Sequence, residues 1–361
     1  ANGSKLGFTM YNNTLKMAEL KEKCKLYMSD KGLLFDGEII TDNQIHRYSA
    51  DHKKNKLDEW YTAYEGITVY GNPFLVVIFG SWSDGSKYEY RSYDRETKFT
   101  QDEKIELKKF LQISRAKAEE EIKTSHESAA KEAKINWNKC SDISPTEEYS
   151  RYLKLKNIDA VGIRFGLNNQ NYPSLIIPIK NVLGDLRSLQ YISVDNNGKS
   201  YKSFLHKGEK RGNFHVLGNI SASEETVFIT EGYATGCSVY KAVNKPVIIA
   251  FDAGNIEKVI ENIKSGFPHL LIIVAGDSDE TGRKKAKDAA NRFGCEVTFP
   301  IFSEKNKDLT DFNDLLQVSG IDEVRRQLQK NNNEDSLKKL AESNLVTKEE
   351  PCEKFKLYYL P

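Results

Sequence analysis

The spacing of apolar and polar residues changes along the chain, and each spacing predicts a different element. Residues 33–95 alternate short apolar runs with turn sequences such as Asp84-Gly85, which predicts a small antiparallel β region. Residues 102–138 hold no Gly or Pro and many Glu, Lys and Ala, which predicts one long helix or a broken pair. Ser144 and Glu147 have capping-box spacing and predict a short helix over residues 146–157.

Strand-like spacing returns after this helix and then changes character at Thr226. Residues 175–179, 189–194 and 199–205 are separated by turn sequences and predict an antiparallel sheet. Compact apolar strands then alternate with helical stretches: strands over 227–230, 246–250, 270–274 and 296–299, helices over 234–243, 255–265 and 280–293. This alternation predicts a parallel sheet covered by helices on both faces. The fold class is therefore α+β in the first part and α/β in the last.

Composition narrows the class of protein without revealing its chemistry. Lys and Arg number 53 against 52 Asp and Glu, so net charge does not indicate a nucleic-acid partner, and any binding surface needs local segregation of charge. The apolar runs are too short to cross a membrane, and no signal peptide is evident. Five scattered cysteines fit a reducing cytoplasm and form no zinc-binding pair, so no zinc is expected.

Acidic residues follow two strands of the predicted parallel sheet. Glu231-Gly232 comes directly after the first strand, and Asp277-Ser278-Asp279 follows the third after two residues. Ligands of such sheets bind at the carboxyl ends of the strands, and a glycine at 232 would let the chain turn tightly beside one. Carboxylates that meet at one rim repel each other unless a cation lies between them. Mg²⁺ (or Mn²⁺) is the expected ion, and Glu231 is also a candidate general base.

A fourth acidic group follows the last strand, in Asp311-Phe312-Asn313-Asp314. Asp311 is a candidate metal ligand, yet it also has the position of a helix N-cap, and capping is the more ordinary role for one of the two aspartates. Charge segregates most clearly before the parallel sheet, where five cations face the single acid Glu209: Lys199, Lys202, Lys207, Lys210 and Arg211. Such a strip suits nucleotides or a template backbone, while the alternative is a solvated hairpin.

Several segments together resemble a known family. A strand followed by Glu231-Gly232, and a later strand followed by Asp277-x-Asp279, look like the TOPRIM domain of bacterial primases, topoisomerases and some nucleases. Further segments resemble primases of plasmids, phages and other mobile elements: Asp252-Ala253-Gly254-Asn255, Asp279 to Ala286, and Asp311-Phe312-Asn313-Asp314-Leu315. The resemblance extends over roughly residues 33–318 and includes the stretch from Gly198 to Gly208, which favours Lys202 and Lys207 as the binding lysines.

What the resemblance implies is a DNA primase, a DNA-directed RNA polymerase that makes RNA primers on single-stranded DNA from ribonucleoside triphosphates. Glu231, Asp277 and Asp279 would be catalytic and would bind metal together with Asp311; Gly232, Asn313 and Asp314 would belong to the same motifs. A TOPRIM nuclease and a non-catalytic single-strand-binding or replisome-adaptor module remain alternatives. A topoisomerase is disfavoured because a chain of 361 residues lacks room for gate domains.

The predicted organisation has five parts: residues 10–100, a β-rich region; 101–145, a helical connector; 146–225, the sheet with the basic strip; 226–330, the TOPRIM domain; and 331–361, a tail or linker. Residues 1–9 resemble a cloning leader before Met10 and are left aside. In the β-rich region Trp60, Trp82 and the basic cluster His52, Lys53, Lys54 and Lys56 predict either template binding or, more ordinarily, a sheet core. No Walker loop is present, and the resemblance implies a replicative helicase, fused after the tail or separate.

Overall fold

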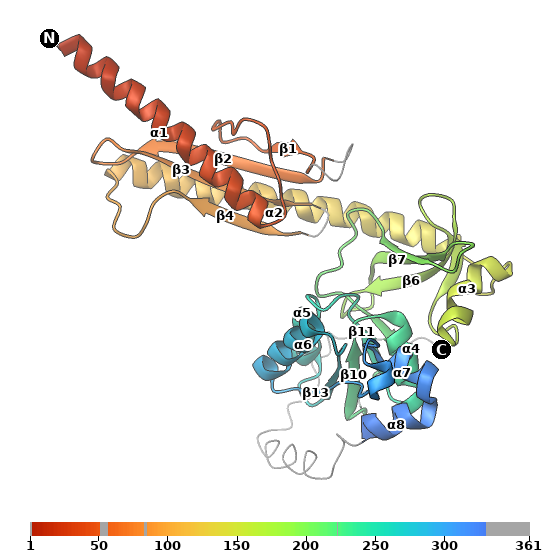
Figure 1. Cartoon of the computed structure of the whole chain (residues 1–361). Coiled ribbons are helices and arrows are strands. Elements are labelled where there is room, and N and C mark those ends of the chain that lie inside the picture. The colour runs from red at the N-terminus through yellow and green to blue at the C-terminus, as the bar shows by residue number, and fades with distance from the viewer. Residues whose placement is uncertain (1, 51–56, 83–84, 222, 330–361) are drawn as a thin grey trace. The chain divides into compact units, whose positions relative to one another are not determined.

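The computed structural model describes residues 2–50, 57–82, 85–221 and 223–329, with side chains from residue 12 onward (Figure 1). His52, Lys53, Lys54 and Lys56, together with the tail from residue 331, lie outside the described residues. The chain divides into two compact units, Ala1–Glu127 and Ser128–Pro361. None of the helices in the described ranges is long and apolar enough to cross a membrane.

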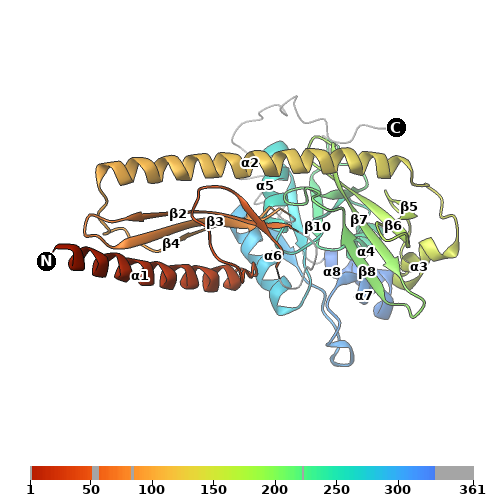
Figure 2. The ribbon, with the colours of Figure 1, turned by 90° about the horizontal axis from the view of Figure 1, so that it is seen from above.

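The first unit is an antiparallel sheet with a helix on each face, as Figure 2 shows. Its strands follow chain order: β1 (His46–Tyr48), β2 (Glu59–Ile67), β3 (Pro73–Ser81) and β4 (Lys87–Arg91). In β3, Leu75 and Val77 pack toward α1 (Asn2–Asp30), while Val76 and Ile78 pack toward α2 (Gln101–Asn138). Successive side chains of a strand point to opposite faces, so this apolar run is buried on both. The predicted β region is confirmed, but α1 was not predicted.

The two tryptophans of the first unit belong to its core. Trp60 is fully buried and Trp82 nearly so, and their rings stack with centroids 4.9 Å apart. They pack with Leu107 and Phe110 of α2, so the hypothesis that Trp60 and Trp82 stack on a template is wrong for the folded protein. The helix predicted over residues 102–138 is a single continuous helix, and its first half covers the sheet instead of only connecting two regions.

The second unit begins with an antiparallel sheet whose strands again follow chain order: β5 (Arg164–Leu167), β6 (Pro173–Lys180), β7 (Leu186–Val194) and β8 (Ser200–Phe204). One face packs on Ala129 and Ala133 at the end of α2, and the other packs on α3 (Glu147–Lys156). The predicted sheet and helix are confirmed. The predicted capping box is wrong, because Thr146 is the N-cap without a side-chain cap bond, and Ser144 Oγ donates to the Thr146 carbonyl.

The rest of the second unit is a five-stranded sheet in the order β13-β12-β10-β11-β9. The four parallel strands are β10 (Thr226–Thr230), β11 (Val247–Ile249), β12 (Leu271–Ala275) and β13 (Glu296–Thr298). They confirm the predicted parallel sheet. The antiparallel edge strand β9 (His215–Leu217) was not predicted.

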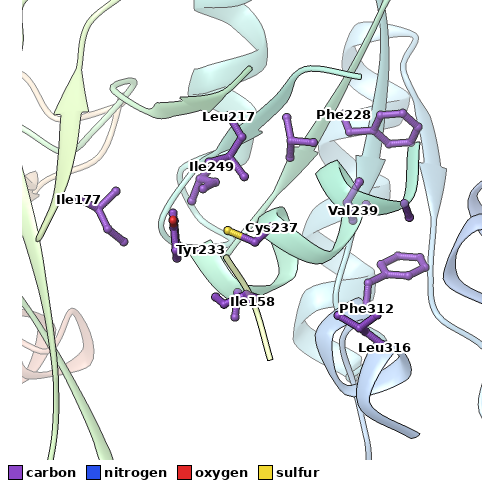
Figure 3. Close-up of a cluster of buried hydrophobic side chains, with 14 of the residues drawn as sticks. Ile158, Ile177, Leu217, Phe228, Tyr233, Cys237, Val239, Ile249, Phe312 and Leu316 are labelled. Carbon is purple, nitrogen blue, oxygen red and sulfur yellow. The ribbon is translucent and has the colours of Figure 1, made fainter. Parts of the chain in front are cut away.

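Helices cover both faces of this sheet, and alternate residues of each strand enter two separate cores. Phe228 and Ile249 pack with α4 (Tyr233–Val243), α7 (Phe312–Ser319) and α8 (Ile321–Gln329), and Figure 3 shows part of this core around Cys237 and Phe312. Val227 and Ile248 pack with α5 (Ile256–Gly266) and α6 (Glu280–Phe293). A short 3₁₀ helix, η1 (Glu304–Asn306), precedes α7. The helices packed on both faces hold the sheet in place, and with it the ends of β10 and β12, which the acidic residues follow.

Candidate metal and nucleotide site

The acidic residues gather where the direction of chain winding reverses in the parallel sheet. From β10 the chain passes through α4 to β11 on one side, and it then crosses to β12 on the other side of β10. Open α/β sheets bind ligands in the crevice at such a reversal, at the carboxyl ends of the strands. Glu231 directly follows β10, and Asp277 follows β12 after Gly276, so the two carboxylates border this crevice from neighbouring parallel strands.

A second loop brings Asp311 to the same place. The Ser278 amide and its hydroxyl both donate to the Thr310 carbonyl, at 2.8 and 3.0 Å, which ties the Asp277–Asp279 loop to the start of α7. Asp311 is the N-cap of that helix and accepts from the Asn313 and Asp314 amides at 2.7 and 2.8 Å. The expected capping role of Asp311 is therefore confirmed, and the cap also holds its carboxylate within electrostatic reach of Asp277.

Asp277 is the centre of the carboxylate cluster. Its pKa is raised to about 7, first by burial and then by the negative charges of Glu231, Asp311 and Asp279, against the opposing charge of Lys202. Its Oδ1 atom is buried and has no hydrogen-bond partner among the described residues. A buried carboxylate oxygen without a donor is uncommon in folded proteins and indicates a partner of another kind.

Burial also raises the pKa of two other members of the cluster. For Glu231 the charge of Asp252 is the next cause, while Lys202 and Lys285 oppose the shift. For Asp311 the bond from the Asp314 amide opposes the effect of burial. Three carboxyl groups are thus less acidic than usual in one place, and perturbed titratable groups of this kind collect at functional sites.

Asp279 and Gly232 take positions that the sequence did not fully predict. Asp279 is the N-cap of α6 and accepts from the Gly282 amide at 2.8 Å, so Asp277-Ser278-Asp279 is a loop that enters a helix rather than an extended strand. The tight turn expected at Gly232 is wrong: its φ of −107° is open to any residue, and a Cβ there would lie 3.9 Å from the nearest atom, Thr235 Oγ1. Gly282 needs to be glycine instead, since a Cβ would lie 2.8 Å from the Asp277 carbonyl oxygen.

Asn313 and Asp314 form hydrogen bonds to neighbouring helices and to the preceding loop rather than joining the carboxylate cluster. The fully buried Asn313 amide donates to the Lys156 carbonyl at 2.8 Å and to Ser238 Oγ at 3.0 Å, which joins α7 to α3 and α4. Asp314 Oδ2 accepts from the Thr310 amide at 3.1 Å. Both residues therefore support the loop that places Asp311.

Within the described residues, only two of the five cations of the predicted basic strip interact with acidic residues of the site. Lys202 on β8 acts electrostatically on Glu231 and Asp277, and Lys210 forms an ion pair of 2.5 Å with Asp252 while lying 4.9 Å from the centre of the Phe204 ring. In the described parts of the chain, no recorded interaction brings the other three cations of the strip to the acidic cluster: Lys199, Lys207 and Arg211.

Asp252, Asn255 and Lys285 are residues of the site that the sequence did not assign. Asp252 and Lys285 both act on Glu231, and both lie beside the place where a Cβ of Gly254 would be. The buried Asn255 side chain accepts from the Gly212 amide at 2.6 Å and donates to the carbonyls of Lys210, Asn213 and Ala250. The Asp252-Ala253-Gly254-Asn255 segment was identified in the sequence as part of the resemblance. Its contacts show that it holds the loop of residues 210–213 against the sheet.

The residues fit a divalent cation, although they do not enclose one. Within residues 12–50, 57–82, 85–221 and 223–329, no three acidic, histidine or cysteine side chains are placed to hold a metal ion together. The unpartnered Asp277 oxygen and the mutual repulsion of the carboxylates are nevertheless what a hard cation would relieve. The donor set is entirely carboxylate oxygen, which is the ligand type that Mg²⁺ and Mn²⁺ prefer.

Comparison with known proteins agrees with this geometry. The family profile described as "Toprim domain" matches residues 226–322, which contain β10 to β13 and all four carboxylates of the cluster. Residues 226–322 are therefore similar to Toprim domains. The matched region begins at β10, and the antiparallel sheet precedes it in the chain.

Two curated relatives, both named DNA primase TraC and both from Escherichia coli, resemble a longer part of the chain. One is 29% identical over 280 residues, which are 73% of this chain and 18% of the relative. The other is 30% identical over 277 residues, which are 73% and 24%. The chain thus matches about a fifth of the length of these relatives.

Among solved structures, a DNA primase domain from Pseudomonas aeruginosa is 14% identical and aligns over 57% of this chain and 78% of that chain, with a TM-score of 0.40. The zinc-binding and RNA polymerase domains of the Aquifex aeolicus primase are 14% identical and align over 91% and 89%, with a TM-score of 0.38.

Proposed function

We propose that this chain is the polymerising part of a DNA primase, which joins ribonucleotides into short RNA primers on single-stranded DNA. The observation that carries the proposal is the buried, unpartnered Asp277 oxygen in a cluster of carboxylates at the crevice of a Toprim domain. The similarity to two proteins named DNA primase TraC, over 73% of the chain, supports the same function.

The proposed cofactor is Mg²⁺ or Mn²⁺, with no zinc. Asp277 and Glu231 would be its principal ligands, and Asp279 and Asp311 would each contribute the Oδ2 oxygen that does not cap a helix. A divalent ion bound there would neutralise triphosphate charge and favour attack by a 3'-hydroxyl. Burial raises the pKa of Glu231, so it is also a stronger base than an ordinary carboxylate and is proposed as a proton acceptor.

The basic residues are proposed to bind phosphates. Lys202 and Lys285 act on Glu231 from β8 and α6, so an incoming triphosphate would find a cation on either side of the carboxylates. Lys210 would exchange its Asp252 partner for a phosphate. The rest of the strip, Lys199, Lys207 and Arg211, is proposed to contact the template backbone, which carries one negative charge per nucleotide.

The proposed setting is the cytoplasmic replication of a plasmid, a phage or another mobile element. The substrates are ribonucleoside triphosphates and single-stranded DNA, and a replicative helicase is the proposed partner, whether fused to this chain or separate. The free thiols of Cys24, Cys140, Cys237 and Cys295 are compatible with a reducing compartment.

A primer-synthesis assay tests the proposal and separates it from its alternatives. The wild-type protein receives single-stranded DNA, labelled ribonucleotides and Mg²⁺ or Mn²⁺, beside Asp277→Asn and Asp288→Asn. Asp288 is an exposed acid on the same helix as the Asp279 cap, so it is a matched control. Short labelled RNA from wild type and Asp288→Asn, with at least a hundredfold less from Asp277→Asn, is the expected result. Degraded DNA would instead establish a nuclease, and intact DNA without RNA would favour a binding module.

A further inference from the structure

A pocket of about 560 Å³ lies in the second unit, at the end of the antiparallel sheet where the β5–β6 and β7–β8 turns meet α3. Its volume is in the range of small-molecule sites in proteins. Its lining residues come from those two turns, from β7 and β8, and from α3, and none belongs to the carboxylate cluster. The pocket is therefore separate from the proposed metal site.

Two tyrosines, Tyr172 and Tyr201, line this pocket. Tyr172 and Tyr201 are 59% and 48% exposed, so both are accessible to a ligand. The Tyr201 hydroxyl donates to Asp195 Oδ2 at 3.1 Å, so the ring is held in one orientation. Exposed and fixed aromatic rings are the platforms on which proteins stack unpaired bases.

Polar groups in the same pocket are suited to the edge of a base. The Ser193 and Ser203 hydroxyls and the Gln170 side-chain amide form no hydrogen bond with any described residue, so their donors and acceptors are available. Arg151 reaches from α3 to the β7–β8 turn, where its guanidinium donates to Asn196 Oδ1 at 2.9 Å. A planar cation held in this way can stack on a base as well as hydrogen-bond to it.

The charge of the residues that line the pocket favours a neutral base over a phosphate as its ligand. Arg151 is the one cation among the lining residues, and it is outnumbered by Glu148 and Asp195. A phosphate would be repelled by this balance, whereas a neutral heterocycle would not. Lys199 lies just outside the lining, with its Nζ 5.2 Å from the centre of the Tyr201 ring, so a cation for the neighbouring phosphate is at hand.

Strand β8 connects this pocket with the carboxylate cluster. Tyr201 and Ser203 point to one face of the strand, and Lys202, which acts on Glu231 and Asp277, points to the other. We propose that the pocket binds an unpaired base of the single-stranded DNA template and so positions the strand beside Lys202. The identity of the strand as template rests on the proposed function, whereas base binding itself does not.

The test is the affinity of the full chain for a short single-stranded DNA, measured by fluorescence anisotropy without metal or nucleotides. Tyr201→Ala and Tyr172→Ala should each bind about tenfold more weakly, because each variant loses one aromatic ring on which a base stacks. Tyr201→Phe, which keeps the ring, should bind nearly as tightly as wild type. Tyr70→Ala is the control, since Tyr70 is 69% exposed and lies in the first unit. Both pocket tyrosines are exposed, so circular dichroism should show that the variants fold.

An oligonucleotide with abasic sites makes the outcome decisive. Wild type should bind it about tenfold more weakly than normal DNA, and Tyr201→Ala should bind both equally. Equal wild-type affinity for the two oligonucleotides, or unchanged affinity in Tyr201→Ala, would overturn the proposal. Primer synthesis is scored separately: primers without a Tyr201 effect would refute only the pocket, and a Tyr201 effect without primers would refute only the polymerase.

Discussion

At the scale of single residues, the most informative group is a carboxyl that the fold makes hard to ionise. Asp277 is buried next to Glu231, Asp311 and Asp279, and its pKa is raised to about 7. In the unfolded chain the same group titrates near its ordinary value of about 3.9. The folded state therefore binds more protons than the unfolded state between these two values, and this group lowers stability as the pH rises from about 4 to about 7.

This pH dependence predicts that Asp277→Asn stabilises the metal-free protein at pH 8, because the variant cannot acquire the buried charge. The gain should be at least about 1 kcal/mol in unfolding free energy, and it should vanish below about pH 4, where the carboxyl is protonated in both states. Urea unfolding in EDTA at a series of pH values measures the difference between variant and wild type. A variant less stable than wild type at pH 8 would show that the Asp277 charge is already compensated.

Two glycines of the site are expected to respond to alanine by different amounts. A helical Gly→Ala change ordinarily stabilises by up to about 1 kcal/mol, but at Gly282 the new Cβ would lie 2.8 Å from the Asp277 carbonyl oxygen. Gly282→Ala should therefore destabilise by about 1–3 kcal/mol and disturb the Asp277 loop. Gly232→Ala has room and should cost at most about 1 kcal/mol. Thermal unfolding of both variants makes the comparison, and a harmless Gly282→Ala would mean that α6 does not press against Asp277.

At the scale of elements, one side chain fastens the loop that carries Lys210 to the parallel sheet. Asn255, at the start of α5, bonds to backbone groups of Lys210, Gly212 and Asn213. Asn262, further along α5, donates a hydrogen bond of 2.8 Å to the Gly212 carbonyl. Since an unsatisfied buried backbone group costs about 1–3 kcal/mol, Asn255 outweighs Asn262 in holding this loop.

We expect Asn255→Ala to destabilise the protein by about 2 kcal/mol or more, and Asn262→Ala by about 1 kcal/mol or less. Both changes are read from urea unfolding curves. In primer synthesis, Asn255→Ala should raise the nucleotide KM more than it lowers kcat, because Lys210 loses its fixed position without any change to the carboxylates. A loss of kcat at constant KM would instead mean that Asn255 shapes the carboxylate rim.

At the scale of the whole molecule, the sequence predicted the parallel sheet well and the first unit less completely. Glu231 and Asp277 were predicted to meet because each follows an apolar strand, and neighbouring parallel strands end at one edge. The burial of Trp60 could not be predicted from the sequence. The strands of its sheet carry apolar residues on both faces, and only the structure shows that α1 and α2 cover these faces. The three-residue strand β9 is too short to give a periodic signal.

Tertiary contacts explain the site residues that the sequence did not assign. Asp252 and Asn255 follow a strand in a turn-like Asp-Ala-Gly-Asn segment, where only the folded loop 210–213 reveals what they bind. Lys285 lies in a helix that also carries Lys284 and Lys287, and the sequence alone does not distinguish a site lysine from a solvated one. Conversely, Asn313 and Asp314 occur in a motif of the family yet act through packing and turns.

Calorimetric titration of the protein with Mn²⁺ at pH 8 measures whether the Asp277 carboxylate binds a divalent cation. Wild type and Asp288→Asn should bind Mn²⁺ with equal affinity, and Asp277→Asn should bind at least tenfold more weakly. At pH 6, below the raised pKa of Asp277, wild-type affinity should fall because the cation must displace a proton. Equal Mn²⁺ affinity in wild type and Asp277→Asn would contradict the account, whatever the polymerase activity of the protein proves to be.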